Sequence, residues 1–137
     1  MNKNEELFKR VKELNLPIGE YAIFGSGPMG IRNLREMHDI DIIVSDRIFD
    51  EYLNKQEWKI REIYGYQDCL KNDSLEIEMG RDWHEGWDVE EMIREAEIID
   101  GLPFVKLEYL IEWKKFYRRE KDLKDVEMIE KFLNNEK

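Results

Sequence analysis

The chain has 137 residues, enough for one domain with a sizeable core and too few for a second substrate-binding domain. Its 42% hydrophobic content is typical of a soluble globular protein. Because the N-terminus is polar and no apolar run approaches the roughly 20 residues of a membrane span, we expect a cytoplasmic protein without a membrane partner. The net charge of −10 disfavours long nucleic acids, since an acidic surface repels their phosphates. The one cysteine, Cys69, excludes an internal disulfide and is expected to serve in packing.

The first segment predicts an amphipathic helix that covers a sheet, because apolar residues recur at helical spacing between residues 5 and 15. The apolar run from Tyr21 to Phe24 then has the length of a buried strand. It ends in Gly-Ser-Gly-Pro-Met-Gly at residues 25–30, where three glycines and a proline force a turn. Between this turn and the next strand, Arg32, Arg35 and His38 are either phosphate contacts or solvated charges.

A second strand is expected from Asp39 to Val44. Because side chains alternate along a strand, Asp39 and Asp41 share one face, about 7 Å apart, and the isoleucines beside them point into the core. Two aspartates this close repel each other once ionised, so a cation or hydrogen bonds must compensate. Mg²⁺ takes one or two carboxylates plus the phosphates of a nucleotide. Backbone N–H groups of the turn and the Ser26 hydroxyl can cradle those phosphates, so the pattern favours metal-assisted phosphoryl or nucleotidyl transfer.

The order Gly25-Ser26, twelve intervening residues and Asp39-Ile40-Asp41-Ile42 resembles the signature of the nucleotidyltransferase superfamily, which includes DNA polymerase beta and aminoglycoside nucleotidyltransferases. The longer string at residues 24–32 is most similar to a group of small stand-alone bacterial proteins in that superfamily. The resemblance implies a Mg²⁺-dependent enzyme that moves a nucleoside monophosphate from a nucleoside triphosphate, ATP first, to a hydroxyl. By this resemblance Asp39 and Asp41 hold the metal, and Gly25, Ser26 and Gly27 hold the triphosphate.

A third carboxylate is expected on the strand that runs from Leu75 to Met79, where superfamily members carry one. Alternation places Leu75, Ile77 and Met79 toward the core, and Glu76 and Glu78 on the opposite face. We expect Glu78 to join the catalytic and metal-binding acids, with Glu76 as the other candidate. The alternative is an edge strand with solvated glutamates. A following aromatic loop with Trp83, His84 and Trp87 either stacks on a base or caps the core.

Two C-terminal helices are predicted, and the segment that joins them is basic. Six basic and two acidic residues between positions 114 and 124 leave it with a charge of +4. The segment is similar to a lysine, arginine and Lys-Asp-x-x-Asp pattern of minimal nucleotidyltransferases. That resemblance implies phosphate contacts from Lys114, Arg119 and Lys121, with Asp122 and Asp125 orienting those cations or capping the last helix. A solvated helix pair is the alternative.

These patterns together predict an α/β fold in which residues 1–137 form a single nucleotidyltransferase-like domain, with a small mixed β-sheet flanked by helices and a C-terminal helix pair. Two other functions stay open: an inactive nucleotide-binding regulatory domain, which the departure of Gly27-Pro28 from the common superfamily loop favours, and a toxin–antitoxin-type interaction module. The acceptor is open among a small molecule, a protein side chain and a tRNA end. A homodimer or a partner protein is a candidate to complete its pocket.

Overall fold

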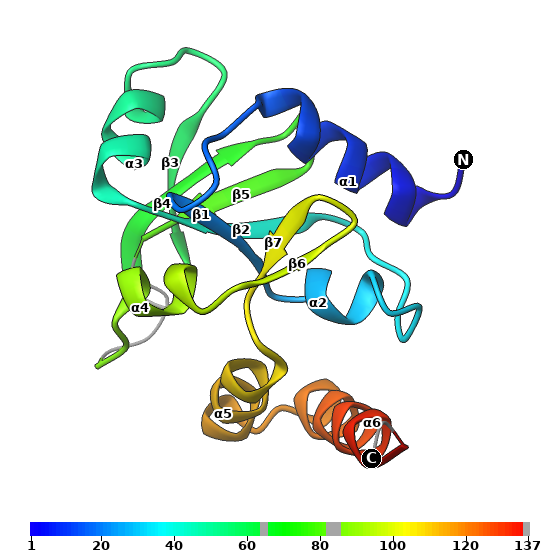
Figure 1. Ribbon diagram of the computed structural model, residues 1–137. Helices are drawn as coiled ribbons and strands as arrows, with labels where there is room; N and C mark the ends of the chain where they lie inside the picture. Colours follow the sequence, from blue (N-terminus) through cyan, green and yellow to red (C-terminus); the bar gives the residue numbers. More distant parts are fainter. Residues whose placement is uncertain (64–65, 82–85, 136–137) are drawn as a thin grey trace.

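The computed structural model of the chain describes residues 1–63, 66–81 and 86–135 (Figure 1). Within these residues the strands are β1 (Tyr21–Phe24), β2 (Ile40–Val44), β3 (Lys59–Ile63), β4 (Tyr66–Asn72), β5 (Ile77–Gly80), β6 (Glu97–Ile99) and β7 (Leu102–Phe104). The helices in the same residues are α1 (Lys3–Leu14), α2 (Gly27–Gly30), α3 (Asp46–Leu53), α4 (Val89–Arg94), α5 (Leu107–Tyr117) and α6 (Glu120–Asn135).

The described strands form one mixed sheet in the order β3-β4-β5-β2-β1-β7-β6. At its centre β1 runs antiparallel to β2 and parallel to β7, while β2 runs parallel to β5. Antiparallel hairpins, β3 with β4 and β6 with β7, form the two edges. The predicted α/β class with a mixed sheet and a C-terminal helix pair is therefore confirmed.

Helices cover both faces of the sheet, as alternation along β1 and β2 requires. Ile23, Ile40 and Ile42 point to one face, where they pack with buried residues of α1 and α3. Phe24 and Ile43 point to the other, where they pack with buried residues of α2, α4, α5 and α6. In Figure 1, α5 and α6 lie together below the sheet, and α2 lies between the sheet and α6. No helix in the described part of the chain is both long and apolar enough to cross a membrane.

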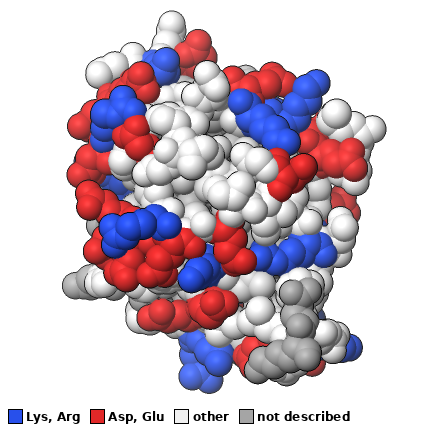
Figure 2. Space-filling model, viewed as in Figure 1, with Lys and Arg blue, Asp and Glu red and all other residues white. Residues whose placement is uncertain are grey.

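Acidic and basic side chains are mixed on the surface. Figure 2 shows Lys and Arg interspersed with Asp and Glu around a central area that carries neither. The face drawn there presents no continuous basic tract of the kind that follows a nucleic-acid backbone.

Candidate active site

The turn after β1 is built so that the backbone approaches β2 closely. Gly25 has a φ of +64°, which L-residues rarely adopt, and a Cβ placed on it would lie 2.3 Å from Oδ2 of Asp41. A Cβ on Gly27 would lie 2.1 Å from Cγ2 of Ile23. Pro28 follows at the start of α2, where a missing N–H costs least. Ser26 is partly exposed, and its side chain does not cap α2. Glycine is thus needed at both positions to bring the turn against Asp41.

Asp41 lies in the middle of the sheet, between Phe24 of β1 and Glu78 of β5. Asp39 stands just before β2, which begins at Ile40, one residue later than expected. Burial raises the pKa of Asp41 well above its usual range, and the charges of Glu78 and Asp39 raise it further. The charges of Lys114 and Lys71 act in the opposite direction. The two predicted aspartates are therefore close enough to interact, and an added cation would relieve their repulsion.

The two candidate glutamates lie in different places. Glu78 pairs in register with Asp41, so their side chains emerge from adjacent strands on one face of the sheet. Glu76 does not share that face, because β5 begins only at Ile77 and Glu76 has a left-handed φ of +58°. Its carboxylate instead forms ion pairs with Lys3 and Arg10 of α1, and the first of these contacts, followed by the second, lowers its pKa. The expectation that both glutamates face the same way was wrong, because the chain turns at Glu76 before the strand starts.

Two basic residues that the sequence patterns did not single out hold Glu78. Lys71 of β4 is paired in register with Glu78, and its Nζ lies 3.3 Å from Oε1. Arg61 of β3 donates from Nη1 to the same oxygen at 3.3 Å. Both residues alternate with other side chains on their strands, as surface residues do, so the only available signal was weak. The pairing of β4 with β5, which brings them to the acids, is not readable from local pattern.

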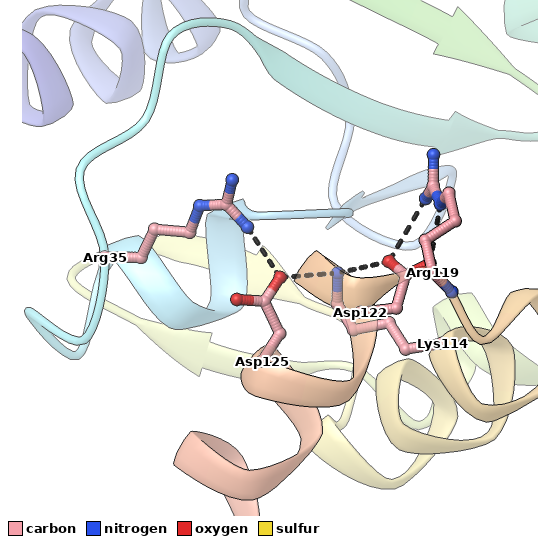
Figure 3. Close-up of polar contacts among 5 residues, drawn as sticks. All are labelled: Arg35, Lys114, Arg119, Asp122 and Asp125. Carbon is pink, nitrogen blue, oxygen red and sulfur yellow. Dashed lines mark hydrogen bonds and ion pairs between the residues drawn. The ribbon is translucent and has the colours of Figure 1, made fainter.

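The C-terminal cations form a closed ion network with the two aspartates of the same segment (Figure 3). Lys114 is buried, and its Nζ lies 3.0 Å from Oδ2 of Asp125 and 3.7 Å from Oδ1 of Asp122. Arg119 donates from Nε to Oδ2 of Asp122 at 2.6 Å. Burial raises the pKa of Asp122, but the hydrogen bonds and charge of Arg119, with the charge of Lys114, outweigh it and lower that pKa. The aspartates thus orient these cations, as expected.

The remaining basic candidates differ in exposure and partner. Lys121, in the first turn of α6, is exposed. Arg35 donates from Nη1 to Oδ2 of Asp125 at 2.6 Å and so joins the network (Figure 3). Arg32 donates to the carbonyl oxygen of Pro28 at 2.7 Å. His38 is exposed.

The segment between α2 and Asp39 is fastened on a second side by α1. The side-chain amide of Asn4 donates to the carbonyl oxygen of Arg35 at 2.9 Å and accepts from the N–H of Met37 at 2.7 Å. Together with the Arg35–Asp125 ion pair, these bonds connect the segment that leads to Asp39 with both α1 and α6.

One aromatic residue of the expected loop can be placed. Trp87 packs edge-on against Phe24, with ring centroids 5.9 Å apart, and against Tyr109 at 5.8 Å. This is the core-capping arrangement. Trp83 and His84 lie outside the described residues.

The donors fit a divalent cation held by few protein ligands. Among residues 1–63, 66–81 and 86–135, no group of three or more His, Cys, Asp or Glu is arranged around a common metal position. Mg²⁺ commonly takes one or two carboxylates, completing its shell with phosphate oxygens and water. Asp39 and Asp41 meet that requirement, since they are hard oxygen donors whose mutual repulsion a cation relieves.

A separate hollow of about 640 Å³ lies at the other end of β2. Its lining includes Val44, Asp46, Arg81 and Trp87. It does not include Asp41 or Glu78, so it is distinct from the acid cluster.

No protein-family model and no curated protein matches the chain. Among solved structures, a Thermotoga maritima protein described as a "putative nucleotidyltransferase" aligns with 96% of this chain and 90% of its own, at 20% sequence identity and a TM-score of 0.45. That description names the superfamily which the turn and the aspartates resemble. A likeness of this size does not identify a function, so the function has to be inferred from the geometry of this chain alone.

Proposed function

We propose that the chain is a Mg²⁺-dependent nucleotidyltransferase that moves a nucleoside monophosphate from a nucleoside triphosphate, ATP first, to a hydroxyl of an acceptor. The observation that supports this most directly is the contact between the glycine turn and the acid cluster, because Gly25 lies against Asp41 while Glu78 adjoins Asp41 on the next strand. A phosphate-binding backbone turn and metal-binding carboxylates are needed at one point for this chemistry, and they meet here.

The acids divide the work between them. Asp39 and Asp41 would hold Mg²⁺, which when bound neutralises charge on the phosphates and orients them for displacement. Glu78 adjoins Asp41 and would complete the cluster or accept the proton of the attacking hydroxyl. Exclusion of water from the buried side of Asp41 strengthens each of these interactions.

The phosphate side of the site would use the turn and the basic segment. The backbone N–H groups of Gly25 and Gly27 and the exposed part of Ser26 would contact the triphosphate. Lys114 already acts on Asp41 through its charge. Lys121 is exposed and would contact the outer phosphates, while Arg119 would have to share its guanidinium between Asp122 and phosphate.

A second candidate is an inactive nucleotide-binding domain. The closed ion pairs of Lys114 and Arg119 favour it, because cations that are fully engaged by Asp122 and Asp125 offer less charge to a leaving pyrophosphate. The two candidates differ in whether bound ATP is consumed when acceptors are supplied.

The test is calorimetric titration of the four nucleoside triphosphates, with and without Mg²⁺, into wild type and Asp39→Ala/Asp41→Ala. The matched control is Glu13→Ala/Glu130→Ala, which removes two exposed carboxylates on α1 and α6 and changes the net charge equally. The proposal expects Mg²⁺-dependent binding that is lost in the aspartate variant and retained in the control. Equal binding by all three proteins would refute it.

A further inference from the structure

The carboxylate of Glu78 is occupied on both sides by basic groups. Lys71 and Arg61 each lie 3.3 Å from its Oε1, so one oxygen serves two cations. The Glu78 side chain is 9% exposed, whereas Lys71 is 24% and Arg61 is 51% exposed. The acceptor is therefore fixed within the sheet, and its two partners reach it from the solvent side.

These contacts also act on Asp41. Glu78 stands beside Asp41 in the register of β5 with β2, and Lys71 stands beside Glu78 in the register of β4 with β5. The three side chains thus emerge in a row on one face of the sheet, with charges in the order minus, minus, plus. A divalent cation attracted by the first two is repelled by the third.

We infer that Lys71 and Arg61 are exchangeable counter-ions of Glu78, which compete with a divalent cation for the acid cluster and so set the affinity of the site for that cation. This rests on the proposed function, because it takes Asp39 and Asp41 as the metal ligands. Before the cation binds, the two basic residues compensate the charge of Glu78. When it binds, Glu78 is drawn toward it, and the partly exposed Lys71 and Arg61 are free to turn to solvent or to an anionic substrate.

The experiment measures Mn²⁺ binding from the loss of the paramagnetic resonance signal of the free ion, in wild type, Lys71→Met, Arg61→Met and Lys59→Met. Lys59 is the matched control, because it is exposed and stands opposite Lys71 on β3, one strand further from Glu78. The expected result is about fivefold tighter binding in Lys71→Met, the scale of one partly exposed ion pair. A smaller gain is expected in Arg61→Met, and less than about a twofold change in Lys59→Met. Thermal unfolding without metal verifies that each variant is folded.

The outcomes separate this inference from the proposed function. If wild type binds Mn²⁺ and Lys71→Met binds it equally or more weakly, the cations are ordinary cross-strand partners and the inference fails while the metal site stands. If Lys59→Met gains as much as Lys71→Met, the effect is one of net charge and the inference also fails. If only the Lys71 and Arg61 variants bind, counter-ion competition is supported in its strongest form. If no protein binds, the metal site fails and the inference with it. Arg61→Met, at a half-exposed position, keeps the test available if Lys71→Met does not fold.

Discussion

Gly25 and Asp41 touch across the junction of β1 and β2, so closely that a single methyl group on the glycine would lie 2.3 Å from a carboxylate oxygen. The turn and the acid are therefore one unit, in which neither can be changed without moving the other. Four predictions test this arrangement and the ion pairs around it.

Gly25→Ala is expected to lose about 2–4 kcal/mol of stability, from left-handed backbone strain and the clash with Asp41 together. Gly101→Ala is the control, because Gly101 also has a positive φ, of +81°, but a Cβ added there would meet nothing within 4 Å. The control should lose only about 1–2 kcal/mol from strain. Urea denaturation of both variants checks this, and equal losses would contradict a close contact with Asp41.

Asp41→Asn is expected to be more stable than wild type at pH 7 in the presence of a chelator. Burial, followed by the charges of Glu78 and Asp39, raises the pKa of Asp41 in the folded protein. A raised carboxyl pKa contributes stability below the ordinary aspartate pKa, and that contribution is lost as the pH rises through the folded pKa. The neutral asparagine avoids this loss, and we expect a gain of about 0.5–2 kcal/mol.

Denaturation of Asp41→Asn and wild type from pH 7 down to about pH 3.5 measures the pH dependence, and the difference should shrink toward the acidic end, where the aspartate is protonated in both states. A variant that is less stable than wild type at pH 7 would show that hydrogen bonds to the carboxylate outweigh its desolvation.

Asp125→Asn is expected to lose about 3–5 kcal/mol, because it leaves the buried Lys114 with one fewer anionic partner. Arg35→Met removes a partly exposed cation from the same carboxylate and should lose at most about 1 kcal/mol. Urea denaturation gives both values. A reversed order would mean that Arg35, rather than Lys114, is the partner that fixes Asp125.

The thiol of Cys69 is expected to resist labelling by a disulfide reagent at pH 8 while the protein is folded. Burial, with the charges of Glu78 and Asp41, raises its pKa to about 12, so that almost no thiolate is present. Labelling should become complete in urea. Absorbance of the released reagent measures both rates, and rapid labelling without urea would show that this face of the sheet opens readily.

The local parts of the fold could be predicted from the sequence, and the pairing of distant strands could not. The strand–turn–strand of residues 21–44 follows from apolar runs and glycines that impose short-range geometry. The packing role of Cys69 is confirmed, since it is buried within the core. The separation of Glu76 from Glu78 depends on a left-handed residue that alternation does not reveal. Lys71 and Arg61 reach Glu78 only through the register of β3, β4 and β5, which is set by the whole sheet.

The segment before Asp39 takes its position from both α1 and α6, through Asn4 and Asp125. Arg35 and Asp125 are 90 residues apart along the chain. As the ribosome makes the protein, the first aspartate of the pair emerges long before the helix that fixes the segment ahead of it. The acid cluster therefore reaches its final arrangement only late in synthesis, after residue 125 has left the ribosome, which keeps an unfinished chain from presenting a formed site.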